Sequence, residues 1–163
     1  MQPLPPWEDL RRGIGCPLCV GRRNVDFHWF VRTLRLSSLF LTRGQTYRGS
    51  CALIVDGRHV NHISELTAEE WLLVAQDLRD SERAVLQVFA PDHMNIESLG
   101  NTVPHLHWGL VPRYKSDGRW GHPIWTTDRS EMKRELLADS EYASYVRQLQ
   151  EALDALARMA PGN

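Results

Sequence analysis

Two histidines separated by a single residue carry the most reactive side chains in the sequence. His105 and His107 lie within NTVPHLHWGLVPRY, residues 101–114, where apolar residues occupy alternate positions. Side chains alternate between the two faces of a β-strand, so a strand over about 103–111 puts His105, His107 and Gly109 on one face. The opposite face is apolar, with Leu106, Trp108 and Leu110. Because an imidazole is partly neutral at pH 7, the histidine face can supply a nucleophile, a proton carrier or a metal ligand.

A glycine and an asparagine directly precede this strand. Gly100 lets the backbone approach an anion closely, and the Asn101 amide supplies N–H donors. These two residues favour a phosphate-binding loop beside the histidines over a merely solvated strand edge.

A second pattern, Cys16-Pro-Leu-Cys19, has the spacing at which two thiolates bind one tetrahedral Zn²⁺. Such a pair can also be a redox pair, but no thioredoxin-like βαβ pattern surrounds it. Zinc needs two further ligands, and His59 and His62 are candidates because they follow a short apolar stretch. The alternative is a zinc-free protein with two surface cysteines.

The strands that position these side chains can be read from residue types. β-branched and aromatic residues predict one or two strands within 25–41, and an apolar run predicts a short strand over 51–55. Another strand is expected over 94–99. Pro112 is expected to end the histidine strand.

Two amphipathic helices are predicted around these strands. Thr67 and Glu70 form a capping box, and the helical apolar pattern that follows ends near Phe89, just before Pro91. A second helix is predicted over 130–159. Strands early and in the middle, with helices between and after them, predict an α+β fold with helices against one face of an antiparallel sheet.

Composition limits the classes of protein that fit. A chain of 163 residues with 42% apolar residues fits one domain, predicted over 16–163 after a Pro- and Gly-rich lead-in over 1–15. The net charge of -1 argues against a groove for a nucleic-acid polymer. Three cysteines argue against a disulfide framework. Without a signal-like run near the start or a membrane-spanning apolar stretch, a cytoplasmic location with no membrane partner is expected.

The stretch 99–114, LGNTVPHLHWGLVPRY, resembles the signature of histidine-triad proteins, His-φ-His-φ-His-φ-φ, where φ is apolar. It is most similar to the bacterial members described as dinucleoside-polyphosphate hydrolases, and the similarity runs from Cys16 to about Trp125. The resemblance implies a sheet of about five antiparallel strands with two longer helices. It also implies a homodimer with the two sheets joined, and a small-molecule nucleotide as ligand.

The resemblance implies roles for single residues. His107 matches the middle histidine, the nucleophile that attacks the α-phosphorus of a nucleoside di- or polyphosphate and carries a transient nucleotidyl group. Asn101 and Thr102 match contacts to phosphate or leaving group, and Asn95 matches an asparagine near ribose and phosphate. Arg113 closes the strand, where its guanidinium is a candidate for a bidentate phosphate contact.

Some histidine-triad proteins hold zinc with a Cys-X-X-Cys pair, a histidine just after the third strand and the first histidine of the triad. Carried over to this chain, the ligands are Cys16, Cys19, His59 and His105, with His62 competing for the third position. Four protein ligands leave no open coordination position, so the resemblance implies a structural Zn²⁺ that does not activate water.

The chain departs from the signature at the third histidine, which is Gly109. Glycine cannot donate a proton, and general acid catalysis is typically worth ~10²–10⁴-fold in rate. Turnover is therefore expected only for substrates with acidic leaving groups, unless His122 reaches the space beside Gly109. Two alternatives to a hydrolase stay open: a nucleotide-binding sensor or partner module with weak or lost turnover, and a nucleotidyl transferase.

Overall fold

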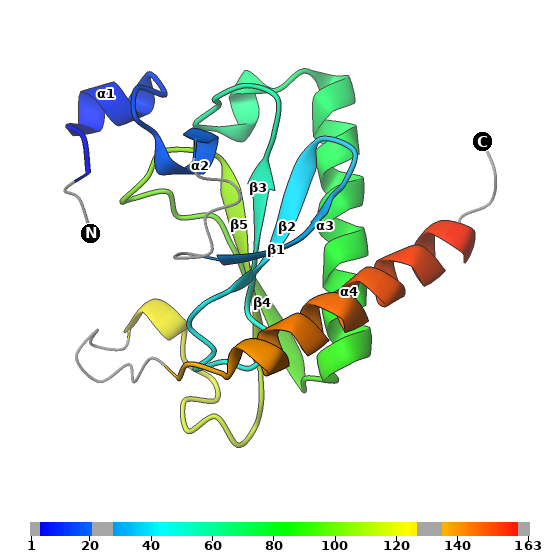
Figure 1. The fold of residues 1–163 in the computed structure, drawn as a ribbon. Coiled ribbons are helices and arrows are strands. Elements are labelled where there is room, and N and C mark those ends of the chain that lie inside the picture. Colours follow the sequence, from blue (N-terminus) through cyan, green and yellow to red (C-terminus); the bar gives the residue numbers. More distant parts are fainter. Residues whose placement is uncertain (1–3, 21–27, 127–134, 160–163) are drawn as a thin grey trace.

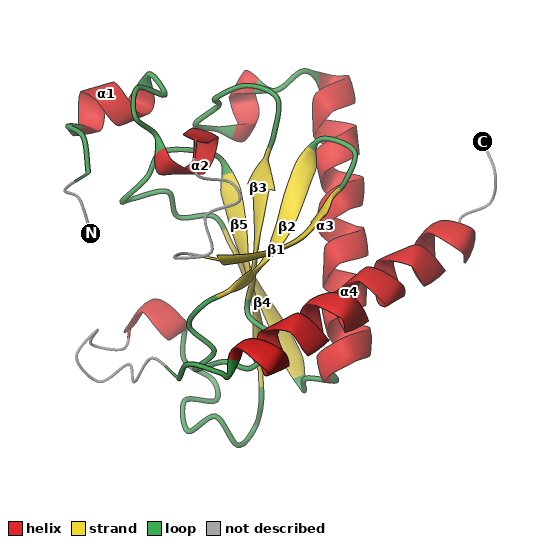
Figure 2. Ribbon diagram, in the orientation of Figure 1, coloured by secondary structure: helices red, strands yellow, loops and turns green. Residues whose placement is uncertain are grey.

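The computed structural model describes residues 4–20, 28–126 and 135–159, and within them one antiparallel sheet of five strands. The strands lie side by side in the order β1, β2, β3, β5, β4 (Figures 1 and 2). The predicted α+β fold is confirmed, and the stretch expected to hold one or two strands holds two. The strands are β1 (His28–Thr33), β2 (Ser37–Thr42), β3 (Cys51–Val55), β4 (His93–Glu97) and β5 (His107–Arg113).

Two long helices and several short ones complete the described part of the chain. The first long helix begins as predicted: the Thr67 hydroxyl accepts from the Glu70 backbone N–H, and the Glu70 carboxylate accepts from the Thr67 N–H. It ends at Phe89, and the next residue, Ala90, caps it with a left-handed backbone (φ 44°) just before Pro91. The helices are α1 (Trp7–Arg11), α2 (Pro17–Val20), η1 (Ile63–Glu65), α3 (Ala68–Phe89), η2 (Ile124–Thr126) and α4 (Asp139–Met159).

The predicted bounds of the histidine strand are wrong at both ends. The strand starts at His107, because Leu106 turns its N–H to the carbonyl of Val60. It also continues through Pro112. The pairing of β3 with β5 ends at Leu110, so Pro112 lies beyond β3, where a missing N–H leaves no ladder hydrogen bond unmade.

The second long helix is shorter than predicted. It begins at Asp139 rather than at residue 130, and residues 127–134 lie outside the described part of the chain. Glu135 is not helical; its carbonyl accepts a hydrogen bond from the Gln45 N–H. Leu137 donates its N–H to the Tyr142 hydroxyl. These hydrogen bonds use backbone groups of the segment before the helix starts.

Both long helices pack on one face of the sheet. Their apolar stripes meet the side chains that point to that side, including Leu106 just before β5 and Trp108 and Leu110 on it, as predicted for the face opposite His107. The other face carries a smaller apolar cluster of Phe40, Ala52 and Ile54, against which Leu18 of α2 packs. None of the described helices has the length and apolar character needed to cross a bilayer.

The two edges of the sheet differ. At the β1 edge, the Gln150 side chain of α4 donates to the Val31 carbonyl at 2.8 Å, and Arg32 pairs with Asp154. Strand β4 forms the other edge, and its extensive contacts within the described chain are with β5 alone. Among the described residues, one sheet edge is therefore covered by α4 and the other has no strand partner.

Candidate functional site

Four cysteine and histidine side chains from three separate segments meet at one end of the sheet. Cys16 and Cys19 come from the α2 segment, His59 follows β3, and His105 precedes β5. Their ligand atoms all lie within 4.8 Å of one another. Sγ of Cys19 lies 3.3 Å from Nδ1 of both His59 and His105, and Sγ of Cys16 lies 3.6 Å from Nδ1 of His105.

Both imidazoles of this Cys/His cluster present the same nitrogen to the sulfurs. Nε2 of His105 lies 2.9 Å from the Val55 carbonyl oxygen, which can only accept, so this nitrogen carries the proton. Nε2 of His59 lies 3.3 Å from Oδ1 of Asn61 and is placed to donate in the same way. Nδ1 of each ring is then left with a lone pair toward the cysteines, the arrangement in which protein histidines bind metals.

The geometry fits zinc. With Zn–S of about 2.3 Å and Zn–N of about 2.0–2.1 Å, a tetrahedral site has S···N separations of about 3.6 Å. The observed separations of 3.3–3.6 Å are close to this value. Of the two histidines considered for the third position, His59 belongs to the Cys/His cluster, while His62 is exposed and lies outside it.

The segment predicted as a lead-in is part of the structure around the cluster. Leu10 of α1 is buried, and the carbonyl of Arg11 accepts from the Asn61 side chain at 3.2 Å. Gly13, at φ +79°, approaches the ring of His59 so closely that a Cβ there would lie 3.0 Å from its Cγ. The N-terminal segment thus helps to orient a candidate metal ligand.

His107 is half-buried at the start of β5, on the face away from the two long helices. Its Nδ1 lies 2.5 Å from the carbonyl oxygen of His105, so Nδ1 carries the proton and donates it. The lone pair of the neutral ring is therefore on Nε2. An imidazole fixed in this tautomer presents a nucleophilic nitrogen in a defined direction.

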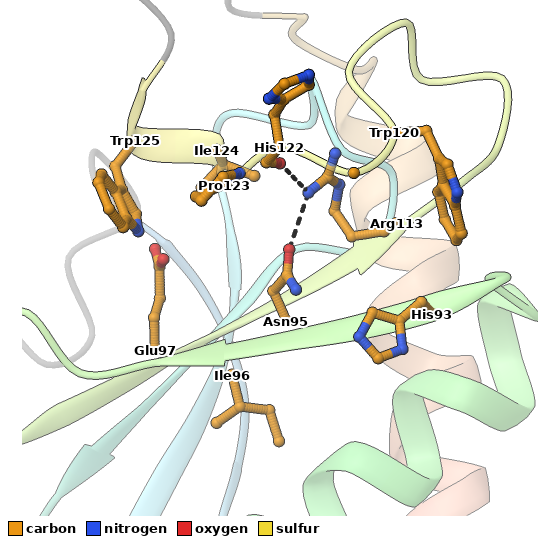
Figure 3. A pocket seen from close by; sticks show the side chains of 11 residues that line it. His93, Asn95, Ile96, Glu97, Arg113, Trp120, His122, Pro123, Ile124 and Trp125 are labelled. Atoms are coloured by element: carbon orange, nitrogen blue, oxygen red, sulfur yellow. Dashed lines mark hydrogen bonds between the residues drawn. The ribbon is translucent and has the colours of Figure 1, made fainter.

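A pocket of about 490 Å³ opens beside β4 and β5 (Figure 3). Asn95 and Glu97 project from β4 into it, while Ile96 points to the opposite side of the strand. The loop after β5 forms the other wall, with the two exposed indoles of Trp120 and Trp125. The remaining lining residues are His93, Ile96, Arg113, Gly121, His122, Pro123 and Ile124.

Arg113 is buried and already engaged within the protein. Its Nε donates to Asp117 at 2.7 Å, one terminal nitrogen donates to Asn95 and to the carbonyl of His122, and the other donates to the carbonyl of Arg119. Four of the five guanidinium N–H groups are used in this way. Arg113 therefore holds the loop that lines the pocket in place. The predicted phosphate contact would have to use its one remaining N–H donor.

Two of the predicted phosphate contacts lie apart from this pocket. Asn101 and Thr102 are exposed in the loop between β4 and β5, and neither lines the pocket, whereas Asn95 does. Gly100, at φ +64°, supplies the left-handed turn before them. His122 is exposed, and its ring points away from β4 in Figure 3.

The space beside Gly109 is taken by a residue that the sequence motifs do not mark. Glu97 is the cross-strand partner of Gly109. A Cβ on Gly109 would lie 3.3 Å from Cγ and 3.6 Å from Oε1 of Glu97. Burial raises the pKa of the Glu97 carboxyl above its ordinary value. The pairing of β4 with β5 is the signal that could have found it.

His28 is a second residue that motifs do not reveal. It begins β1 and is half-buried, with its ring centroid 6.2 Å from that of Phe40. Its Nδ1 is buried without a hydrogen-bond partner. Burial, with a smaller contribution from the charge of His107, lowers the pKa of His28 to about 4. A neutral imidazole therefore lies within electrostatic range of His107.

One protein-family model matches this chain. The model of the HIT domain matches residues 30–116. Among solved structures, a histidine triad protein from Bradyrhizobium japonicum is 21% identical with a TM-score of 0.71, covering 80% of this chain and 94% of its own. One from Marinobacter aquaeolei is 24% identical with a TM-score of 0.72, covering 84% and 96%.

A zinc-bound histidine triad family protein from Mycobacterium smegmatis is 19% identical with a TM-score of 0.62, covering 89% of this chain and 97% of its own. These structures share the fold. A comparison with curated protein sequences gives no match. Because the family model spans more than half of the chain, this protein belongs to the HIT-domain family.

Proposed function

We propose that this protein is a zinc-containing nucleotide hydrolase that acts at the α-phosphate of nucleoside di- or polyphosphates, such as diadenosine polyphosphates. The observation that carries the proposal is the state of His107, whose Nδ1–H is held by the His105 carbonyl so that Nε2 carries the lone pair. Membership of the HIT-domain family, whose proteins are generally nucleotide hydrolases or transferases, supports it.

In the proposed reaction His107 is the nucleophile. Its Nε2 attacks the α-phosphorus, a P–N bond forms, and the bond from phosphorus to the leaving group breaks. Water then attacks the nucleotidyl-histidine, releases the nucleoside monophosphate and restores the free imidazole. Asn95, Asn101 and Thr102 hold ribose and phosphate through their amide and hydroxyl groups, and Arg113 keeps the adjoining wall in place.

The proposal assigns a structural Zn²⁺ to Cys16, Cys19, His59 and His105. The S···N distances and the two protonated Nε2 atoms support this assignment. With four protein ligands the ion has no open position, so what it supplies is rigidity around His105 rather than an activated water.

We expect residues 16–163 to act as one domain, in the cytoplasm, with a small-molecule nucleotide and a second copy of the chain as partners. The formal net charge of -1 argues for a free nucleotide rather than a nucleic-acid polymer.

The deciding experiment incubates the protein with diadenosine tetraphosphate and follows products and covalent adduct by mass spectrometry. Turnover that His107→Ala abolishes, while the exposed His62→Ala leaves it unchanged, supports the hydrolase. An adduct without turnover would instead indicate a nucleotidyl transferase lacking its acceptor. Tight binding with neither adduct nor turnover would indicate a sensor or partner module and would overturn the proposal.

A further inference from the structure

We propose that Glu97 is the proton donor to the leaving group, in the place that the third histidine of the triad would occupy. The inference rests on the proposed function and names the residue that completes it. Gly109 stands where the motif has its third histidine and has no side chain to contribute. The side chain of Glu97 lies over that glycine.

The position of Glu97 follows from strand pairing. Glu97 on β4 pairs with Gly109 on β5, so both face the same side of the sheet as His107, two residues before Gly109. Diagonal neighbours across two antiparallel strands are about 7–8 Å apart, within reach of a long side chain. Glu97 and His107 are such neighbours.

The glutamate side chain occupies the space that the glycine leaves. Its Cγ and Oε1 lie 3.3 and 3.6 Å from where a Cβ of residue 109 would be. A larger residue at position 109 would push the carboxyl away, so the glycine and the glutamate fit each other.

The carboxyl also belongs to the pocket. Glu97 lines the cavity of about 490 Å³, and in Figure 3 its carboxyl faces the indole of Trp125 at one end. The other titratable or charged residues of that lining are His93, Arg113 and His122. His107 does not line this cavity, whereas Glu97 lines it and also lies over Gly109, two residues from His107. A leaving group held in the cavity would therefore contact Glu97 while the nucleotidyl group is on His107.

The environment makes the Glu97 carboxyl hold its proton more strongly than an exposed glutamate does. Burial already raises the pKa of Glu97. A bound phosphate anion raises the pKa of a neighbouring carboxyl further, because two like charges disfavour each other. Bound substrate therefore promotes the form of Glu97 that can donate.

An adenosine phosphoramidate has an amine leaving group, which needs this proton to depart. Nε2 of His107 forms a bond to phosphorus as the P–N bond to the amine breaks, and the Glu97 carboxylic acid gives its proton to the leaving nitrogen. In the second half, water attacks phosphorus, the bond to Nε2 breaks, and the proton from water returns to the Glu97 carboxylate. This removes the restriction to acidic leaving groups that glycine at position 109 predicts.

The test compares two substrates that share an adenylyl group: adenosine phosphoramidate, with a basic leaving group, and adenosine 5′-(p-nitrophenyl phosphate), with an acidic one. Glu97→Gln keeps size and polarity but cannot act as an acid. We expect kcat for the phosphoramidate to fall by ~10²–10⁴-fold, and kcat for the nitrophenyl ester by less than about tenfold. Glu151→Gln, an exposed glutamate on α4, is the matched control and is expected to leave both unchanged.

The outcomes separate the two proposals. Equal losses on both substrates, or no loss on either, would overturn the role of Glu97 while leaving His107 as nucleophile, provided that His107→Ala abolishes both activities. A wild-type protein that turns over neither substrate would overturn the hydrolase itself and this inference with it. Circular dichroism and thermal unfolding of each variant show whether a loss comes from unfolding.

Discussion

Gly13 lies against the ring of His59, so the N-terminal segment and one candidate zinc ligand share a packing contact. The backbone of residue 13 has a φ of +79°, at which alanine is strained by about 1–2 kcal/mol. The Cβ of an alanine there would lie 3.0 Å from Cγ of His59. We expect Gly13→Ala to displace the ring and weaken zinc binding by about 10-fold or more.

Competition with a chromophoric chelator measures this affinity. Gly118→Ala is the matched control, because Gly118 has a similar φ of +72° but no atom within 4 Å of its would-be Cβ. Equal zinc affinities for the two variants would show that the contact with His59 does not matter to the metal.

His28 gives the protein a pH-dependent stability. Its pKa of about 4 in the folded state lies below its unfolded value of about 6.5. Between these two pH values the unfolded chain binds a proton at His28 and the folded chain does not. The stability is complete above pH 6.5 and is lost as the pH falls toward 4. Between pH 7 and 5 the loss from His28 is about 2 kcal/mol.

His28→Phe removes this titration while keeping a ring next to Phe40. Denaturant unfolding at pH 7 and pH 5 should therefore show a smaller decline for the variant than for the wild type. Identical declines would mean that His28 titrates alike in the folded and unfolded chains.

At this scale the sequence predicts best where chemistry dictates spacing. The Cys-X-X-Cys pair and the histidine motif can be recognised from residue types and spacing alone. The structure brings Cys16, Cys19 and His105 together. Glu97 and His28 carry no local motif. Their importance depends on which strands are neighbours and on how deeply each side chain is buried, and neither property is local in the chain.

Among the elements, α3 holds the turn between β1 and β2 through one buried carboxylate. Asp77 accepts hydrogen bonds from the backbone N–H groups of Arg35 and Leu36, at 3.1 and 2.9 Å, and from the Ser37 hydroxyl at 2.6 Å. It also pairs with the guanidinium of Arg35. The helix therefore ties down the hairpin end as well as packing on the sheet.

Asp77→Ala leaves these buried donors unpaired, so we expect the free energy of unfolding to fall by about 3–5 kcal/mol. Asp80→Ala, one turn later, removes only ion pairs of Arg35 and Arg79 with largely solvated guanidiniums and should cost less than about 1 kcal/mol. Unfolding of the two variants in guanidinium chloride at pH 7 compares their stabilities. Equal losses of unfolding free energy would argue against a special role for Asp77.

The types of the long helices and the strands followed from local patterns, but only some of their ends did. The capping box at Thr67 and the left-handed residue before Pro91 put both ends of α3 where the sequence predicts them. The ends of β5 depend on partners: Leu106 bonds to Val60, and Pro112 is tolerated because β3 stops short of it. No property of residues 103–113 alone contains this information.

On the scale of the whole molecule, the β4 edge, which has no strand partner in the part of the chain that the structure describes, fits the proposed homodimer. Unpaired edge strands are rarely left bare, and antiparallel pairing of β4 with its own copy about a two-fold axis is self-complementary. Exposed apolar side chains lie on this strand and on α3, which precedes it: Trp71, Leu72, Leu73, Leu86 and Ile96.

We expect Ile96→Glu to give a monomer, because it would bury charge where two copies meet. Ile63→Glu, at a residue of similar exposure on η1, should remain a dimer. Sedimentation equilibrium reports the mass of each. A monomeric wild type, or a dimeric Ile96→Glu variant, would contradict pairing through β4.

His105 joins two sites through two different groups. Its ring turns Nδ1 toward the cysteines, while its carbonyl oxygen fixes the ring of His107. In the proposed reaction, a zinc ion that does not contact the nucleotide would thus help to hold Nε2 of His107 in position. If the proposed reaction takes place, too little zinc would lower kcat and leave the affinity for the nucleotide unchanged. The supply of zinc would then control the rate from outside the proposed nucleotide site.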